Sequence, residues 1–557
     1  MAHRSKLIAM SDFRSNARNH LLSFRNEQGW WEGELSSSAL STATAIVALH
    51  LVDERAHASW IHQGRDWLIQ HQNGDGGWGD TPISKSNLST SLLVWSALGL
   101  VGGTPERSAE DYIRTHTKTL DPSDIAAAVI GRYGKDKTFS VPILMLAAIC
   151  GRLGPDGWLR VLPLPFELAA LPRTWFGAVG LPVVSYALPA LIAIGYARFH
   201  HAPPSVLNPL RWLRALSWGR TGPLLKVLQP STGGYLEATP LTSFVTMALA
   251  SSGQKDHLCV PEAVRFLKES MRVDGSWPID TNLATWGTTL AVKALGSDFD
   301  SVDGVKKWLL DQQYKSVHPF TNAAPGGWAW TDLPGGVPDA DDTSGALIAL
   351  SIIGPECVEA AERGVRWLLD LQNRDGGVPT FCRGWGTLPF DRSTPEITGH
   401  ALWAWTVWSD KLCSEIQGRI ASAKARALRY LERARHAGEW CWEPLWFGNE
   451  HAPGEINLIY GTSMVLHYLK QAGVSGMLVD GATEWLKRQQ KPDGSWGCIE
   501  ETAVAMTALG ITSSEWLKRA TNEGTEFPAS PIGLYFARLW YHEKLYPVVW
   551  ALGSAQE

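Results

Sequence analysis

One short pattern recurs along the chain and restricts its fold more than any other feature. Each copy has a helix-like segment, a break rich in Gln or Asp, a Gly-x-aromatic turn and then a helix of small residues. An Asp-Gly or Gly-Gly pair supplies the positive φ that a tight turn requires, and the aromatic ring can stack over a helix end. The clearest copies are GRDWLIQHQNGDGGWGD (64–80) and GATEWLKRQQKPDGSWG (481–497), with weaker copies at 19–35, 224–241, 263–278, 364–379 and 304–313 together with 325–330.

These copies predict an all-α fold of two α/α toroids. Helical hairpins that repeat around a circle bury a shared core. Copies occur in both halves, around an irregular stretch at about 120–232, and strand-like alternation is nearly absent. The 28 Trp residues among 557 fit this fold, because so many large rings need repeated structural slots or an aromatic cavity. We therefore expect one toroid over 12–295 and a second over 296–557.

A cluster of acidic residues is the strongest chemical signal. Residues 338–343 read Pro-Asp-Ala-Asp-Asp-Thr and bring Asp339, Asp341 and Asp342 together before an apolar, helix-like run. Buried carboxylates this close cannot all ionise at low cost, so one proton is held at a raised pKa. A protonated carboxyl that a neighbour positions is a proton donor. A solvated acidic helix cap is the simpler alternative, because Asp favours helix starts.

Composition narrows the setting. A net charge of −5 argues against nucleic acid as the main partner. The seven cysteines are scattered without a Cys-x-x-Cys pair, which indicates reduced thiols in a cytosolic setting. The N-terminal sequence MAHRSKLIAMSDFRSNARNH has no apolar signal core, so we expect no signal peptide.

A membrane-contacting segment is expected at about 174–226. The uncharged stretch 174–197 is long enough for a span, but Pro182 and Pro189 interrupt it, which favours a buried or surface-lying helix. The next segment, LNPLRWLRALSWGRTGPLLKVL, mixes basic residues with Trp and Leu, as in helices that lie in a bilayer interface. An ordinary amphipathic surface helix fits equally well. We expect a peripheral or monotopic protein on the cytoplasmic side of the inner membrane.

The repeats and the acidic cluster together resemble the squalene–hopene cyclase family, the class II isoprenoid cyclases, over nearly the whole chain. The repeats resemble that family's QW motifs, and PDADDTS resembles its proton-donor motif. The resemblance implies two toroids in the βγ arrangement, with the acid in the second, and a reaction without cofactor or metal. It makes Asp341 the donor, with Asp339 and Asp342 holding it in position.

The resemblance also implies partners for the acid. His400 in PEITGHALWAW matches the family's histidine, with Glu396 one helical turn before it. We expect an imidazolium at His400 that stabilises the carboxylate left after proton transfer, and whose charge Asp339 and Asp342 offset. Tyr460 in INLIYGT matches a tyrosine of the water relay that reprotonates the acid.

Further matches imply a cavity wall that faces a carbocation. Aromatic faces stabilise a cation without capturing it, by roughly 0.5–2 kcal/mol each when dry. Trp330 lies nine residues before Asp339, where the family carries such a ring. The other expected wall residues are Trp286, Phe381, Cys382, Phe527 and Tyr535.

Three positions depart from the family pattern. Thr239 replaces a water-holding Gln, Thr242 replaces a Trp that follows paired prolines, and Pro182 replaces a cavity Trp. By the resemblance, these positions line the end of the cavity where late rings form. We therefore expect a main product other than hopene, with early termination that gives fewer rings or a hydroxylated end.

The expected function is a class II cyclisation of a linear polyprenoid, squalene or a similar chain. One alternative is a class II cyclase of a shorter prenyl diphosphate or a meroterpenoid, although the sequence shows no obvious basic phosphate clamp. A non-catalytic lipid-binding toroid is the second alternative, but it has no need for Asp341 together with His400. A protein prenyltransferase would need an Asp-x-Cys zinc site and a class I synthase an Asp-Asp-x-x-Asp magnesium site, and neither motif is found. The expected partners are an apolar polyprenoid and a membrane surface, and a homodimer is left open.

Overall fold

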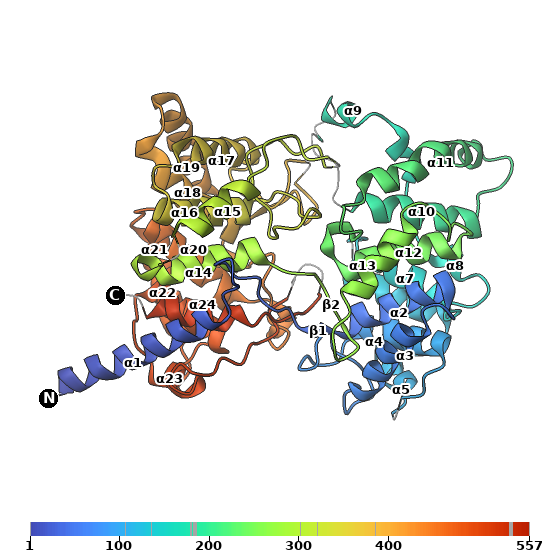
Figure 1. The fold of residues 1–557 in the computed structure, drawn as a ribbon, viewed down its shortest axis with the longest axis horizontal. Coiled ribbons are helices and arrows are strands. Elements are labelled where there is room, and N and C mark those ends of the chain that lie inside the picture. The colour runs from blue at the N-terminus through green and yellow to red at the C-terminus, as the bar shows by residue number, and fades with distance from the viewer. Residues whose placement is uncertain are drawn as a thin grey trace.

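The computed structural model describes residues 2–105, 107–134, 136–178, 181, 187–300, 302–319, 321–384, 386–533 and 538–555. Their helices form two rings, which fill the left and right halves of Figure 1. We call the left one the terminal ring, because both ends of the described chain belong to it, and the right one the inserted ring. The predicted all-α fold of two α/α toroids is confirmed.

The terminal ring has two concentric layers of helices. Its inner helices contact their neighbours in chain order, and the last of them, α24, contacts the first, α14, and so closes the circle. These inner helices are apolar nearly all round, as expected for helices covered on every side. The inner helices are α14 (Ala284–Leu295), α16 (Ala340–Ile353), α18 (Pro395–Trp408), α20 (Leu458–Gln471), α22 (Ile499–Leu509) and α24 (Leu545–Ser554); the outer ones are α1 (Ala2–Ser23), α15 (Val302–Gln312), α17 (Val358–Leu371), α19 (Ser414–Arg433), α21 (Met477–Arg488) and α23 (Glu515–Ala520).

The inserted ring is built in the same way. Its inner helices also contact one another around a circle, which the contact between α12 and α2 closes. The inner helices are α2 (Ala39–Asp53), α4 (Leu88–Val101), α7 (Ser140–Ile149), α10 (Leu188–His201) and α12 (Thr239–Ser251); around them lie α3 (Ala58–Gln70), α5 (Ala109–Thr117), α6 (Pro122–Tyr133), α8 (Gly157–Arg160), α9 (Arg173–Ala178), α11 (Pro209–Leu228) and α13 (Val260–Glu269).

The recurring Trp ties each outer helix to the next inner helix. The indole N–H of Trp328 donates to the Leu309 carbonyl at 2.7 Å, near the end of α15, and its backbone N–H donates to Thr343 Oγ1 at 3.0 Å, on α16. Trp496 repeats both bonds, with Leu486 at 2.8 Å and Thr502 at 3.1 Å. The same pair of bonds recurs at Trp31, Trp78, Trp277 and Trp442, and at Tyr235 through its hydroxyl.

The turn glycines adopt the predicted left-handed backbone, as at Gly76 and Gly494, where φ is +86° and +92°. A Gln before several of these turns donates to backbone carbonyls. Gln313, for example, donates to the carbonyls of Gly326 and Ala360 at 2.8 and 2.9 Å. The repeat is therefore a structural unit, and it holds Trp31, Trp78, Trp277, Trp328, Trp442 and Trp496 in equivalent positions.

The predicted boundary after residue 295 differs from the structure. The core of the terminal ring contains side chains of α1, such as Leu21, and of α14, such as Trp286. The core of the inserted ring is drawn mainly from residues 39–277. The chain therefore leaves the terminal ring after its first helix and returns to it before α14. Where it leaves and returns, β1 (Ser37–Ser38) pairs with β2 (Trp277–Pro278) in antiparallel fashion. A second short pair, β3 (Val378–Pro379) with β4 (Ser393–Thr394), lies within the terminal ring.

The segment expected to contact a membrane is divided in the structure. Within 174–197 the described helices are the end of α9 and the start of α10, and Pro182 lies outside the described residues. Arg214, one of the basic residues in the segment expected to lie in a bilayer interface, is instead buried, and its Nε lies 3.0 Å from Glu167 Oε2. Among the helices that the structure describes, none is both long and apolar enough to cross a membrane.

Candidate active site

An apolar cavity of about 270 Å³ lies where the two rings meet. The terminal ring contributes the starts of α14 and α16 and the segments after β3 and before α20. The inserted ring contributes Phe139, Leu236, Ala238 and Pro240, and the chain just before α24 contributes Leu539 and Tyr541. The acidic cluster is part of this wall, so its three carboxyls lie at the edge of a largely apolar space.

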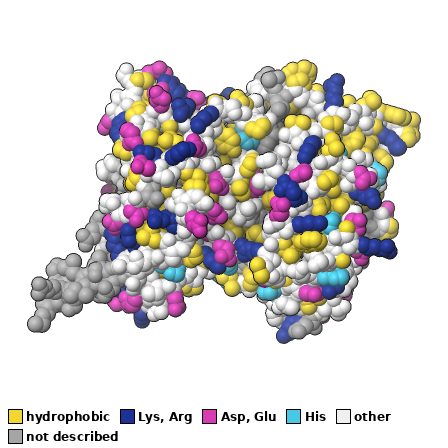
Figure 2. Space-filling view, in the orientation of Figure 1, with side chains coloured by type: hydrophobic (Ala, Val, Ile, Leu, Met, Phe, Trp, Pro, Cys, Tyr) yellow, Lys and Arg dark blue, Asp and Glu magenta, His cyan; other side chains and the backbone are white. Residues whose placement is uncertain are grey.

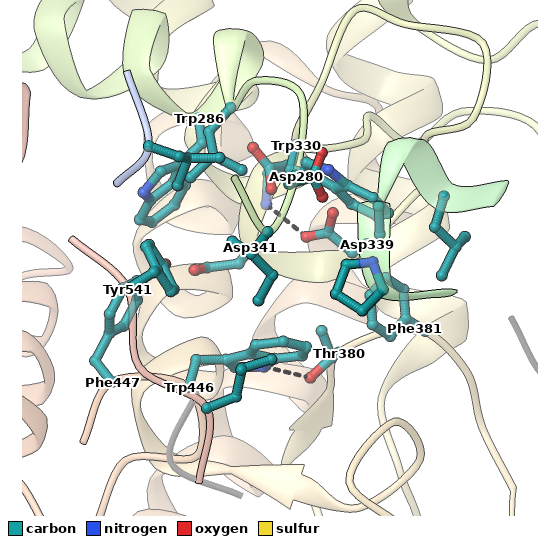
Figure 3. A pocket seen from close by; sticks show the side chains of 18 of the residues that line it. Asp280, Trp286, Trp330, Asp339, Asp341, Thr380, Phe381, Trp446, Phe447 and Tyr541 are labelled. Atoms are coloured by element: carbon teal, nitrogen blue, oxygen red, sulfur yellow. Dashed lines mark hydrogen bonds between the residues drawn. The ribbon is translucent and has the colours of Figure 1, made fainter. Parts of the chain in front are cut away.

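Asp341 points into the cavity (Figure 3). It lies in the first turn of α16, and Asp339 is the N-cap of that helix, accepting the Asp342 backbone N–H at 2.8 Å. Asp339 thus caps the helix but is buried and not solvated as the simpler alternative expects, while Asp341 keeps a side chain that is 19% exposed. The positive end of α16 favours negative charge on a first-turn carboxyl, by about 0.3–1 kcal/mol in exposed settings.

His400 holds the inner side of Asp341. Its Nδ1 lies 2.6 Å from Asp341 Oδ1, its side chain is fully buried, and its ring stacks on Tyr468 at 4.5 Å. Burial, together with the charge of Lys293, lowers the pKa of His400 to about 4, which favours a neutral imidazole over the expected imidazolium. A second basic group is close by, since Lys293 Nζ lies 3.4 Å from His400 Nε2.

Burial also determines the charge of the flanking aspartates. It raises the pKa of Asp339 to about 8 and that of Asp342 well above its ordinary value, and repulsion between the neighbouring carboxylates adds to both shifts. Asp339 and Asp342 thus have the raised pKa that the spacing predicts for buried neighbouring carboxyls. The cluster therefore carries protons at neutral pH.

Glu396 and Tyr460 lie near the acid without a described hydrogen bond to it. Glu396 Oε1 accepts the Leu445 backbone N–H at 2.7 Å, and burial followed by the charge of Asp341 raises the pKa of Glu396 to about 7. The ring of Tyr460 packs against Phe447 at 4.7 Å. Their roles in catalysis and reprotonation stay predictions.

Aromatic rings surround the acid, and three of them were expected. Trp286, Trp330 and Phe381 line the cavity. The Trp330 carbonyl accepts the backbone N–H groups of Thr285 and Trp286 at 3.0 and 3.2 Å, which joins two wall residues at the start of α14. Trp330 and Phe381 meet edge to face, with ring centroids 6.2 Å apart.

Other wall residues were missed by sequence reasoning. Trp446, Phe447 and Tyr541 face the cavity in Figure 3. They lie in irregular segments outside the clear repeats, and the concentration of aromatics in WEPLWF and LWYHEKLYP was the available signal. Asp280 also lines the cavity, and burial raises the pKa of its carboxyl well above the ordinary value. It directly follows a repeat copy, and nothing local distinguishes it.

Several expected wall residues lie elsewhere. Phe527 packs against His20 of α1 at 5.1 Å, and Cys382 is buried beside the wall residue Phe381. Thr242 belongs to the repeat, since its Oγ1 accepts the Tyr235 backbone N–H at 3.0 Å. Thr239 is buried at the start of α12, between the wall residues Ala238 and Pro240. Tyr535, like Pro182, lies outside the described residues.

Comparisons with known proteins identify the family of the chain. Models of the squalene-hopene cyclase N-terminal and C-terminal domains match residues 15–186 and 280–516. A squalene hopane cyclase of Aspergillus fumigatus is 23% identical over 84% of this chain and 75% of its own. The squalene–hopene cyclase of Alicyclobacillus acidocaldarius is 24% identical over 82% and 78%. The solved ent-copalyl diphosphate synthase from Streptomyces platensis is 18% identical, covers 98% of each chain and has a TM-score of 0.58, a likeness of fold. The chain therefore belongs to the squalene–hopene cyclase family of class II terpene cyclases.

Proposed function

We propose that the protein protonates a terminal alkene of a linear polyprenoid, squalene or a similar chain, and cyclises it through carbocations. The observation that carries this proposal is the placement of Asp341, which points into the apolar cavity while His400 holds its inner oxygen at 2.6 Å. A lipid-binding toroid without catalysis would have no use for a carboxyl bonded in this way.

The surroundings of Asp341 suit an acid that must leave a carboxylate behind. Its proton goes to an alkene carbon, and the remaining negative charge is stabilised by His400 Nδ1–H and by the positive end of α16. Asp339 and Asp342 stay protonated because burial raises their pKa values. They therefore add little repulsion when Asp341 becomes charged.

The wall suits the cation that follows. Trp286, Phe447 and Tyr541 offer aromatic faces near the acid, each worth roughly 0.5–2 kcal/mol to a dry cation. The apolar lining excludes water that would quench the cation early, and it folds the flexible chain before reaction. Early termination of the cyclisation stays a prediction, without support from Thr239 and Thr242, which lie outside the wall.

A substrate panel tests the proposal. Purified protein is incubated with squalene, oxidosqualene and shorter prenyl alcohols and diphosphates, and the products are identified by mass spectrometry and NMR. Asp341→Asn keeps the shape of the side chain and its contact with His400 but has no acidic proton. We expect it to fold normally and to lose about 10²–10⁴ in rate. Undiminished turnover by a folded Asn variant would remove Asp341 as the donor.

A prenyl diphosphate is a second candidate substrate, and one observation favours it. Arg363, Arg366, Arg374 and Arg383 line a hollow of about 1120 Å³ that shares Phe381 with the acid cavity. Such a basic hollow could hold a diphosphate while the prenyl tail reaches the acid. The double variant Arg374→Ala with Arg383→Ala should then raise KM for a prenyl diphosphate and leave squalene turnover unchanged.

We also propose that the outer face of the inserted ring contacts a membrane. Exposed apolar side chains gather there on α9, at the top of the view in Figure 2, and on α11, at its upper right. Trp175, Trp212 and Leu216 are 62%, 61% and 80% exposed, and Arg211 and Arg220 lie beside the latter two on α11. Co-sedimentation with anionic vesicles tests this, and Leu216→Asp together with Trp212→Asp should abolish it.

A further inference from the structure

Three inner helices of the terminal ring each send one polar side chain into a common line. Asp341 comes from α16, His400 from α18 and Lys293 from α14. His400 Nδ1 is 2.6 Å from Asp341 Oδ1, and His400 Nε2 is 3.4 Å from Lys293 Nζ. The imidazole therefore lies between a carboxyl on one side and an ammonium on the other.

The chemistry of the two outer groups determines where the imidazole proton sits. An ammonium has three donors and no acceptor, so Lys293 can only donate to Nε2. Nε2 must then carry the lone pair, and the single N–H of the neutral ring must be on Nδ1. Nδ1 is the nitrogen that faces Asp341. The lysine thus selects one of the two tautomers.

We propose that Lys293 is a positioning residue of the acid: its ammonium keeps the His400 N–H on Nδ1, directed at Asp341. The inference rests on the proposed role of Asp341 as proton donor. With Nδ1–H bonded to Oδ1, the acidic proton of Asp341 sits on Oδ2 and is free to reach the alkene. In the transfer the O–H bond breaks, a C–H bond forms, and the electron pair stays on the carboxylate, which Nδ1–H stabilises.

The other tautomer would impair the acid. With the proton on Nε2, the bare Nδ1 would accept the Asp341 O–H at the same 2.6 Å contact. The acidic proton would then be held by the histidine and turned away from the alkene. Because His400 is fully buried and stacked on Tyr468, its ring has no room to exchange the two nitrogens by rotation.

The groups around Lys293 support a positive charge at this point. Asp341 and Asp342 on α16 would raise the pKa of the ammonium whenever either is ionised, His400 on α18 accepts from it, and His467 on α20 is a further titratable neighbour. Burial lowers the pKa of His467 to about 3, so it does not compete as a cation. Burial lowers the pKa of Lys293 to about 8, so the ammonium persists at neutral pH and is lost above it.

Nitrogen NMR of the full-length protein, labelled with ¹⁵N at its histidine side chains, tests the tautomer without any substrate. His400→Gln identifies the His400 signals among the 16 histidines. We expect N–H on Nδ1 in the wild type and in Lys293→Arg, which keeps a donor, and a shift toward Nε2–H in Lys293→Met. If the Met variant does not fold, raising the pH of the wild type above about 8 converts the ammonium to an amine, which can accept from Nε2–H as well as donate to Nε2, so the preference for Nδ1–H should weaken. An unchanged tautomer in the Met variant or at high pH overturns the proposal.

The rate of cyclisation gives a second readout. Wild-type activity should fall as pH rises through about 8, because the required form of Lys293 is the protonated one. Lys293→Met should lower the rate about 10- to 100-fold, and its rate should no longer decrease as pH rises through about 8. Lys293→Arg should retain activity, and its rate should decrease only at higher pH. Lys424→Met is the matched control and should behave as wild type. Lys424 also belongs to the terminal ring, and burial also lowers the pKa of its ammonium.

The two proposals fail in different ways. Wild-type rate and pH profile in a folded Met variant overturn the positioning role of Lys293 while the cyclase function stands. If no polyprenoid is turned over by the wild type, the proposed function fails, and the NMR result still decides whether Lys293 sets the tautomer.

Discussion

Replacing Glu396 by Gln should stabilise the protein at neutral pH and leave its stability nearly unchanged in mild acid. Glu396 lies in the first turn of α18, is 4% exposed, and accepts the Leu445 N–H at 2.7 Å. Burial raises its pKa to about 7, and the charge of Asp341 contributes in the same direction. Gln keeps the acceptor oxygen but cannot ionise, so it mimics the protonated side chain.

The sign and size follow from the pKa. A carboxyl whose folded-state pKa is raised contributes stability that is fully present below its unfolded pKa and is lost as pH rises through its folded pKa. For Glu396 that window runs from its ordinary pKa of 4.5 to about 7. At 1.36 kcal/mol per pKa unit, the wild type loses about 3 kcal/mol across the window, most of it between pH 5 and pH 8. The variant has no such loss.

Thermal unfolding of both proteins at about pH 5 and about pH 8 measures this difference. The midpoint of Glu396→Gln should exceed that of the wild type by a few degrees at the higher pH and match it closely at the lower. Glu484→Gln, at a side chain that is 68% exposed, is the matched control and should show no pH-dependent gain. An equal difference at both pH values would refute the reasoning that a buried charge is responsible.

Three further outcomes are expected. His400→Ala should lower the rate strongly and leave the product unchanged, because His400 lies behind Asp341 and outside the cavity wall; a new product spectrum at near-normal rate, seen by gas chromatography, would contradict this. Phe447→Leu should slow turnover by about 2- to 30-fold and alter the products, since it removes an aromatic face from the wall; an unchanged product spectrum argues against that face. EDTA should not affect turnover of a hydrocarbon substrate, because protonation needs no metal, and a loss that Mg²⁺ restores would favour the diphosphate candidate.

The rings could be predicted because their signal is local. Most turns have a glycine at positive φ, an aromatic ring that reaches back to the end of the preceding helix, and a hydroxyl at the start of the next inner helix. Thr343, Thr502 and Ser91 supply that hydroxyl in three copies. The assignment of α1 to the terminal ring could not be predicted, because it depends on contact with α24 at the far end of the chain.

The acid and its partner show the limit of local patterns in the site. Asp341 and His400 are 59 positions apart, and only the resemblance to a known family paired them before the structure did. Lys293 could have been identified from the sequence in a different way, because it is the one charged residue within the apolar run ATWGTTLAVKAL of an inner helix. A buried lysine requires a partner. Its partner, His400, lies on α18, and the packing that brings α14 and α18 together is not visible in the sequence.

Several carboxyls begin the described inner helices of the terminal ring, and the proposed donor, Asp341, is one of them. Glu396 opens α18, Glu500 and Glu501 open α22, and all three resemble the aspartates of α16 in burial and in their position at the positive end of a helix. Burial raises their pKa values, so they too can hold a proton at neutral pH. Holding a proton is therefore not what distinguishes the donor. Asp341 differs in two contacts: it faces the cavity, where an alkene can reach it, and it bonds to His400, which can stabilise the charge left behind. We therefore infer that two properties distinguish Asp341 as the donor: access to the cavity and the tautomer of His400. Lys293 would act on the second property, because it sets that tautomer.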